Sequence, residues 1–189
     1  MNIDNNFFSK RRSVMAKKMS SDPINKKDLD YILQAGIRVP DHGALNPWKL
    51  NVIQGDALRK IDEEIILTEF IKKNPDSEKN AQEVESRRLQ RAGVVIAVLS
   101  TPVDHPSIPL WEMQLSSGAV CMNLLSSAQS MGYAAQWLTE WYAYNDKMLI
   151  RLGGKKGIDQ ISGFMYIGQK IEEPNERRRP ISESVISYI

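Results

Sequence analysis

The sequence has little cysteine and little histidine: one cysteine and two histidines among 189 residues. A lone Cys121 excludes an intrachain disulfide, which fits a reducing compartment, and its apolar helical surroundings favour a buried, inert thiol. The two histidines, His42 and His105, have no cluster of Cys or Glu beside them at ligand spacing. The sequence therefore predicts no metal site.

Long apolar runs and a strong charge imbalance are also absent. No run approaches the roughly 20 apolar residues that a membrane span needs. The N-terminus, MNIDNNFFSKRRS, lacks the basic-then-apolar order of a signal peptide. The formal net charge is only +2, which gives no strong electrostatic case for nucleic acid or membrane. We therefore expect a cytoplasmic protein.

The common sequence motifs of catalysis are missing as well. The chain has no G-x-G-x-x-G loop, no G-x-x-x-x-G-K-[ST] loop and no G-x-S-x-G elbow. If the chain is an enzyme, its reactive group is therefore expected to come from a cofactor rather than from a side chain.

The composition itself is that of an ordinary globular protein. Hydrophobic residues make up 42% and charged residues 25%, which predicts one domain over residues 1–189 with a sizeable core. The charged segment 75–91 has little to bury, so it forms either a helix or a mobile excursion. We expect a lid or excursion at about residues 70–110.

The apolar patterning predicts helices and strands in alternation. Asn25, followed by Asp28, resembles a capping box that opens a helix. The continuous apolar run at 93–99 is typical of a strand covered on both faces. Expected helices are 3–12, 28–39, 56–73, 110–131 and 145–154, and expected strands are 49–54, 93–99, 133–139, 159–168 and, in the tail, 185–189.

The helix expected at 110–131 carries two apolar stripes, so it lies either centrally in the domain or against another subunit. The first stripe consists of Leu110, Met113, Val120, Leu124, Ala128 and Met131, and the second of Trp111, Leu115, Ala119, Met122 and Leu125.

Two arginine groups are candidate anion sites. Arg11-Arg12-Ser13 offers two guanidinium forks and a hydroxyl, which together suit a phosphate group. The triplet at 177–179, followed by Pro180, could bind an anion as well. Taken alone, the Arg11-Arg12 pair is more often a solvated basic surface. For the triplet, nucleic acid is the other possible ligand, but the overall charge is too balanced to favour it.

Two further stretches could line a ligand. The loop RVPDHGALNPW at 38–48 is stiffened by prolines and offers His42 and Asn46, with Trp48 as an apolar anchor. The stretch Trp137-Leu138-Thr139-Glu140 ends a strand, which is where α/β proteins often place ligand contacts. The plainer alternatives are a structural connection and an ordinary buried tryptophan.

The order of these pieces resembles the FMN-dependent nitroreductase family, in particular its compact bacterial branch of NAD(P)H nitroreductases. The pieces are Arg11-Arg12-Ser13, A-G-I-R-V-P-D-H at 35–42 with Pro47-Trp48, Trp111-Glu112 with Ser116 and Gly118, Gly132 with Trp137, and the basic tail. The resemblance implies an α+β fold with a mixed central sheet flanked by helices. It also implies an intertwined homodimer with FMN sites at the interface and a C-terminal segment, 185–189, that crosses to the partner.

The resemblance also assigns residues to the cofactor site. Arg11 and Ser13 would bind the FMN phosphate, completed by Arg177 and Arg179, with Arg12 on the ribityl or ring side. The other expected contacts are Arg38 and His42 from the opposite subunit, Asn46 in the same loop, and Trp137, Leu138 and Thr139 along the flavin ring. No catalytic side chain is expected, because the flavin N5 carries the hydride.

The implied activity is NADH- or NADPH-dependent reduction of a small nitroaromatic or quinone-like acceptor by a ping-pong mechanism. Alternatives are dehalogenation, flavin fragmentation, or a flavin-binding module without turnover. Two departures bear on reactivity. Met15 stands where the family usually has a basic residue, with Lys17 two positions further on, and Asn46 stands where Gln is usual.

Overall fold

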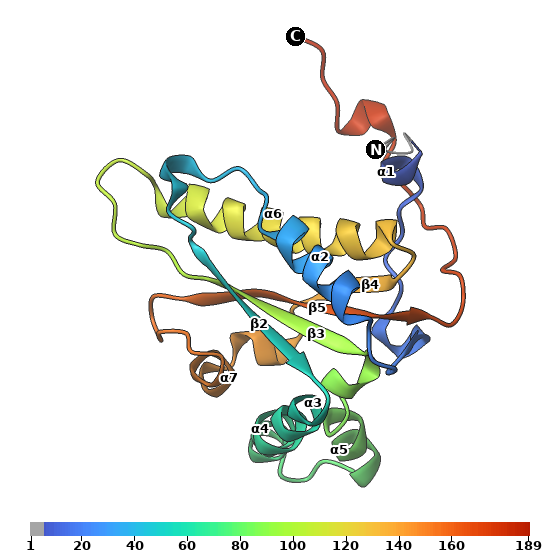
Figure 1. The fold of residues 1–189 in the computed structure, drawn as a ribbon. Helices are drawn as coiled ribbons and strands as arrows, with labels where there is room; N and C mark the ends of the chain where they lie inside the picture. Colours follow the sequence, from blue (N-terminus) through green and yellow to red (C-terminus); the bar gives the residue numbers. More distant parts are fainter. Residues whose placement is uncertain (1–5) are drawn as a thin grey trace.

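The computed structural model describes residues 6–189, and a five-stranded sheet between two helical layers organises them (Figure 1). The strands are β1 (Met19–Ser20), β2 (Trp48–Gln54), β3 (Val94–Ser100), β4 (Ala134–Leu138) and β5 (Gln160–Lys170). They follow the order β1-β5-β3-β2, with β4 also paired to β5. The expected α+β class is confirmed. Every pairing within residues 6–189 is antiparallel, so this single chain does not form the mixed sheet that was expected.

Strand β3 lies inside the sheet and is buried along its whole length. Its alternate side chains enter two separate cores, one on each face of the sheet. Val94, Ile96 and Val98 belong to one core, and Val95, Ala97 and Leu99 to the other. This confirms the expectation of a strand covered on both faces.

One helical layer consists of α2 (Lys26–Gly36) and α6 (Leu110–Ser130), which pack against each other above the sheet in Figure 1. The Asn25 side chain caps α2 by accepting a 2.8 Å hydrogen bond from the Lys27 N–H. The Asp28 carboxylate accepts from the Tyr133 hydroxyl at 2.6 Å, so it ties α2 to the end of α6. The helix ends at Gly36, earlier than predicted.

The opposite layer is built from short helical segments. A continuous run comprises α3 (Asp56–Ile61), a π-helix η3 (Asp62–Leu67) and α4 (Thr68–Lys73), where one α-helix was expected. The charged segment 75–91 contains α5 (Lys79–Glu85) and η4 (Leu89–Arg91), and Leu89 is fully buried, which anchors it. The layer is completed by η5 (Trp141–Tyr144) and α7 (Asp146–Arg151).

Three further segments lie at the chain ends and in the expected lid. The helix expected at 3–12 is α1 (Phe7–Lys10), and residues 3–5 lie outside the described part. The strand expected at 185–189 is wrong for this single chain: after η6 (Ser182–Ser184) the tail is exposed and projects from the body (Figure 1). The lid at about 70–110 stays a prediction. Because β3 lies within that range, only the segments before and after β3 could form such a lid.

Candidate functional site

The two arginine groups predicted from the sequence lie together. Arg12 Nη1 hydrogen-bonds the Asn175 carbonyl and lies 3.3 Å from Glu176 Oε1. Arg179 Nε donates to the same Glu176 oxygen at 3.2 Å, and its Nη2 lies 3.5 Å from the Arg11 carbonyl. The segment after β5 therefore folds back onto the segment after α1. We call Arg11, Arg12, Arg177 and Arg179 the arginine cluster.

The cluster is short of negative charge. Within the described chain, the half-buried Arg11 has a buried Nη1 with no hydrogen-bond partner. Burial lowers the pKa of Arg11, and the charges of Arg179, Arg12 and Arg177 lower it further. A buried donor without a partner costs about 1–3 kcal/mol. A phosphate group would supply both the acceptor and the charge that are missing, so these residues fit the phosphate of a cofactor such as FMN.

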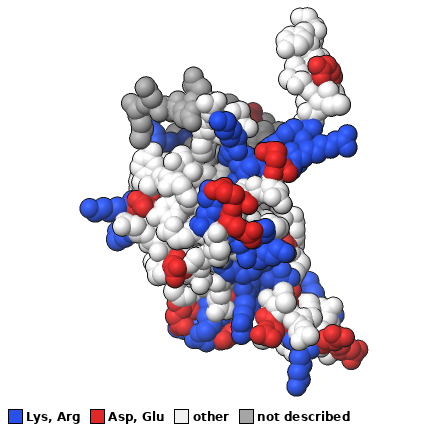
Figure 2. All heavy atoms as spheres, turned by 90° about the vertical axis from the view of Figure 1, so that its right-hand side faces the viewer, with Lys and Arg blue, Asp and Glu red and all other residues white. Residues whose placement is uncertain are grey.

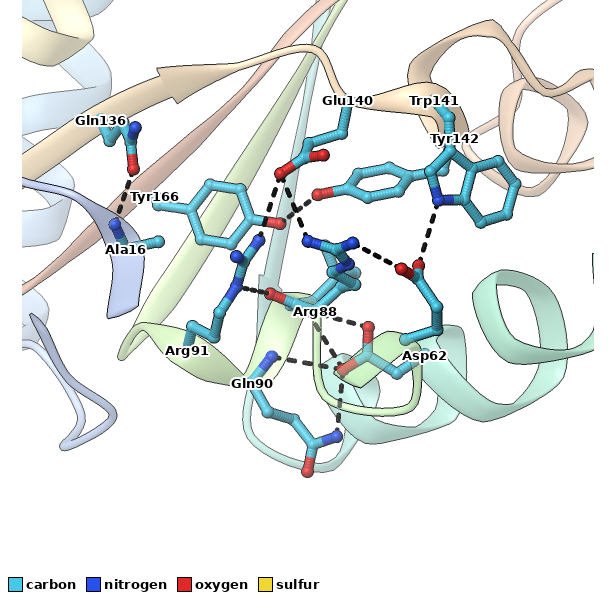
Figure 3. Close-up of polar contacts among 12 residues, drawn as sticks. Ala16, Asp62, Arg88, Gln90, Arg91, Gln136, Glu140, Trp141, Tyr142 and Tyr166 are labelled. Atoms are coloured by element: carbon cyan, nitrogen blue, oxygen red, sulfur yellow. Dashed lines mark hydrogen bonds and ion pairs between the residues drawn. The ribbon is translucent and has the colours of Figure 1, made fainter. Parts of the chain in front are cut away.

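Backbone and amide hydrogen bonds hold the segment that carries Arg11 and Arg12. Gln129 Nε2, in the last turn of α6, donates to the Arg12 carbonyl at 2.6 Å. Val14 N donates to the Ala135 carbonyl of β4 at 3.2 Å. Beyond it, at η1 (Ala16–Lys18), the Ala16 N–H donates to Gln136 Oε1 at 2.6 Å (Figure 3). Ser13 is exposed between these anchors.

A surface groove of about 1130 Å³ starts at the cluster and continues between α2 and α6. It is lined by Arg11 and Arg12 and, at some distance along the chain, by Arg38, Asn123 and Ser126. Figure 2 shows this side of the molecule, with Lys and Arg side chains gathered at the base of the projecting C-terminal segment. Arg38 therefore shares a groove with the phosphate candidates of its own chain, whereas the resemblance assigned it to the partner's site.

Helix α6 also holds the loop at 38–48. Asn123 Nδ2 donates to the Arg38 carbonyl at 2.8 Å, and Ser116 Oγ donates to the Pro40 carbonyl at 2.6 Å. These bonds fix the loop backbone and leave the Arg38 side chain exposed.

His42 lies at the other end of α6. Its Nδ1 is 2.7 Å from Glu112 Oε2, in the first turn of the helix, and the pair is largely exposed. Gln129, which holds Arg12, is 17 residues further along α6. At the helical rise, the two anchor points are about 25 Å apart. Within one chain, His42 is thus not brought to the arginine cluster.

The local geometry around Asn46 explains why this amide is not free. Gly43, Ala44 and Asn46 all have positive φ angles, of 73°, 52° and 49°. The loop includes η2 (His42–Ala44) and is held by Asp41 Oδ2, which accepts from the Asn46 N–H at 2.8 Å. The Asn46 Nδ2 donates to the Ala44 carbonyl at 3.0 Å. The amide therefore already serves the loop itself.

The end of β4 presents an exposed apolar surface, formed by Trp137. The Trp137 indole N–H donates to the Ser162 carbonyl at 3.0 Å, and a Cβ atom at Gly163 would overlap the ring. The indole also lies near Gly118 of α6 and is 37% exposed. Leu138 packs against the core that contains Val95, Ala97 and Leu99. A ligand at this strand end could therefore contact the backbone of Leu138 but not its side chain. Thr139 follows, half-buried.

The second apolar stripe of α6 is largely uncovered in the single chain. Trp111 and Leu115 are 66% and 52% exposed, and Ala119 and Met122 are half-buried. Leu125 is buried. A stripe of this kind is typical of a surface that packs against another protein.

The described residues contain no cluster of metal-ligating side chains, and their free cysteine is buried. Between residues 6 and 189 no group of three or more His, Cys, Asp or Glu side chains could hold a metal ion. Cys121 is fully buried, and burial raises the pKa of its thiol to about 12, as expected for an inert thiol. No helix in this part of the chain is long and apolar enough to cross a membrane.

Sequence reasoning missed Gln129 and Glu176. Each acts through a contact between distant segments, with Arg12 in both cases. No local pattern around either residue signals such a contact.

Comparisons with known proteins identify the family of the chain and proteins of similar fold. A sequence model of the nitroreductase family matches residues 8–169. The Escherichia coli (strain K12) protein named "Putative NAD(P)H nitroreductase YdjA" is 28% identical over 163 residues, covering 84% of this chain and 83% of that protein. A nitroreductase-like family protein from Bacillus cereus superposes with a TM-score of 0.80 at 21% identity, covering 100% of this chain and 97% of the other. A nitroreductase with bound FMN from Bacteroides fragilis gives 0.71 at 18% identity, with 100% of both chains covered.

Proposed function

The chain belongs to the nitroreductase family, and from this premise we propose that it is an FMN-dependent oxidoreductase. It would use NADH or NADPH to reduce nitroaromatic or quinone-like acceptors. The names of relatives support this, since one is called an NAD(P)H nitroreductase and another holds FMN. In this chain, the observation that carries the proposal is the arginine cluster, in which three further arginines act on Arg11 and the buried Nη1 of Arg11 has no hydrogen-bond partner.

The arginine cluster would bind the FMN phosphate. Arg11 would supply the unpaired donor, and Arg177 and Arg179, whose charges already act on Arg11, would share the phosphate charge. Ser13 lies exposed beside them and would add a hydroxyl contact. Arg12 is held by Glu176 and Gln129 and would face the ribityl side.

The flavin ring would lie against the end of β4. The exposed face of Trp137 and the backbone of Leu138 and Thr139 form the surface available to it. Bound FMN would supply the hydride chemistry, so no general base is required of the protein. NAD(P)H and the acceptor would occupy one open flavin face in turn, which is a ping-pong scheme.

A homodimer would complete the site. The second stripe of α6, with Trp111 and Leu115 exposed, offers an apolar surface for a second copy. His42 lies about 25 Å along α6 from the anchor of Arg12. His42, with Asn46 in its loop, would therefore reach a flavin bound mainly by the other subunit. Arg38 would contribute from the groove rim of either chain.

Reactivity would be tuned by the residue at position 15. Met15 is 45% exposed and carries no charge. A positive charge near the pyrimidine edge stabilises reduced, anionic flavin. With Met15 there, and unless Lys17 reaches back, the flavin should have a lower reduction potential than with a basic residue.

The test is a visible spectrum followed by anaerobic reduction. The purified protein should be yellow or take up added FMN, and NADH or NADPH should bleach the flavin, which a nitroaromatic then reoxidises. A colourless protein that ignores added FMN contradicts the proposal. Flavin that NAD(P)H cannot reduce points to a binding module, and reduced flavin that no nitroaromatic or quinone reoxidises points to dehalogenation or flavin fragmentation.

A further inference from the structure

Glu140, just beyond β4, has an unusual backbone conformation. Its φ is 53° and its ψ is 172°, a region that is essentially restricted to glycine. Such conformations persist only where the surroundings enforce them. One residue, Thr139, separates Glu140 from the last residue of β4, Leu138. The contacts that enforce the backbone conformation of Glu140 therefore also set the direction in which the chain leaves β4.

Two arginines lie below the Glu140 carboxylate at ion-pair distances that are longer than a hydrogen bond (Figure 3). Its Oε1 lies 3.6 Å from Arg88 Nη1 and 3.7 Å from Arg91 Nη2. All three side chains are at most about a quarter exposed, at 26%, 20% and 24%. Both arginines come from the segment that precedes β3, so they connect the end of β4 to a distant part of the chain. We call these three residues the clamp.

The arginines of the clamp are themselves fixed. The fully buried Asp62, at the start of the π-helix, accepts from Leu89 N at 2.8 Å and from Gln90 Nε2 at 3.0 Å. Arg91 Nε donates to the Arg88 carbonyl at 2.7 Å. These bonds hold η4 in place and point the two guanidinium groups towards Glu140 (Figure 3).

The residues after Glu140 are fixed by the same network. Glu85 pairs with Arg88 through one oxygen and accepts from the Trp141 indole N–H at 3.0 Å through the other. The Tyr142 and Tyr166 hydroxyls lie 2.6 Å apart in the core. The turn that follows β4 is thus held from both sides.

We propose that Glu140 is a positioning residue for the flavin, because the clamp fixes the backbone at the end of β4 against which the ring would lie. The inference rests on the proposed function, since it concerns the ring side of the same site. The arginine cluster would hold the phosphate independently of the clamp. Loss of the clamp should therefore disturb the ring and its chemistry more than the affinity for FMN.

The test compares Glu140→Gln with a matched control, Glu69→Gln. Glu69 is also buried and ion-paired in the same helical layer, 2.6 Å from Lys147, but its partners are on α7 and its N-cap Asn145 rather than at β4. The measurements are hydrogen exchange of the amides at 137–141 in the flavin-free protein, then the visible spectrum and midpoint potential of bound FMN.

Glu140→Gln should speed amide exchange at 137–141 by about tenfold. It should shift the flavin spectrum and potential and lower kcat/KM for NAD(P)H by about tenfold or more. Glu69→Gln should leave all of these at wild-type values. Arg91→Lys, which keeps the charge, should restore most of the behaviour lost in Arg91→Gln.

Two results overturn the inference, and they are distinguishable from each other. If Glu140→Gln matches Glu69→Gln in exchange, spectrum and potential, then Glu140 is only structural while the proposed function stands. If amide exchange at 137–141 rises in Glu140→Gln but the wild-type protein takes up no FMN, the proposed function fails. The role of the clamp in positioning the flavin then fails with it.

Discussion

Two groups of arginines in this chain differ in the number of carboxylates that surround them. Arg88 and Arg91 lie among Glu85, Glu140 and Asp62, in a network whose charges are compensated (Figure 3). The arginine cluster of Arg11, Arg12, Arg177 and Arg179 has Glu176 as its carboxylate partner. Buried donors without a hydrogen-bond partner occur in both groups, at Arg11 Nη1 and at Arg88 Nε and Arg91 Nη2. The difference therefore lies in the carboxylates around each group and not in its unpaired donors.

The two groups also differ in the direction in which the pKa of an arginine is shifted. The hydrogen bond that Arg88 donates to Glu85 raises the pKa of Arg88 despite burial. Burial and three neighbouring arginines lower the pKa of Arg11. Compensated arginines stabilise a fold, whereas uncompensated ones are expected to bind an anion that the fold does not contain.

Removing an arginine from the compensated network should have the largest effect. In Arg88→Met, the carboxylate of Glu85, which is 4% exposed, would lose its cation. Breaking a buried ion pair from one side costs about 3–5 kcal/mol. Urea denaturation should show this loss of unfolding free energy. The control is Arg87→Met, whose pair with Glu83 is exposed, and it should change stability by about 0.5 kcal/mol or less.

Removing an arginine from the cluster should have the opposite pattern. Arg11→Met relieves like-charge repulsion and an unpaired donor, so the flavin-free protein should lose no stability. Its FMN affinity should fall by about 1.5–3 kcal/mol, the value of a hydrogen bond to a charged group. Fluorescence titration measures the affinity, and Arg178→Met, an exposed neighbour, is the control. A loss of stability like that of Arg88→Met would erase the distinction between the two groups.

The pH dependence of stability tests Asp62, one of the carboxylates of the compensated network. Burial is the main cause that raises the pKa of Asp62 above its ordinary 3.8. The folded state then binds this proton more tightly than the unfolded state, so the contribution to stability is full below 3.8 and is lost as pH rises through the raised value. Wild type should therefore lose stability relative to Asp62→Asn over this range. A difference that instead grows with pH would mean that the hydrogen bonds from Leu89 and Gln90 outweigh burial.

Only a small effect on stability is expected at His42. Its pair with Glu112 is largely exposed, so His42→Ala should change the unfolding free energy by about 1 kcal/mol or less. FMN affinity should nevertheless fall if the loop reaches the flavin of a second subunit. Unchanged affinity, measured by the same titration, would leave the loop as a structural connection.

Much of the fold follows from local patterning. The continuous apolar run of β3 predicted a strand covered on both faces, and the two stripes of α6 predicted a helix that lies centrally or against another subunit. Each element lies within one or two residues of its expected bounds. Periodicity works here because each element buries its own face. It could not reveal the π-helix, or the hydrogen bond between its first residue, Asp62, and Leu89, 27 residues away.

The site was less accessible to sequence reasoning. The family resemblance brought Arg11 and Arg179 to one site, and in the structure they lie together. Glu176, Gln129 and the clamp residues act through contacts between distant segments, which leave no local signal. The tail at 185–189 has strand-like alternation, but a strand needs a neighbour, and this single chain offers it none.

The most direct test of the central claim is the affinity of the flavin-free protein for FMN compared with riboflavin, which lacks the phosphate. If the arginine cluster is a phosphate site, FMN should bind about 100-fold more tightly or better, since several charge-assisted hydrogen bonds depend on that group. Equal affinities would contradict the account, because the uncompensated arginines would then contribute nothing to flavin binding.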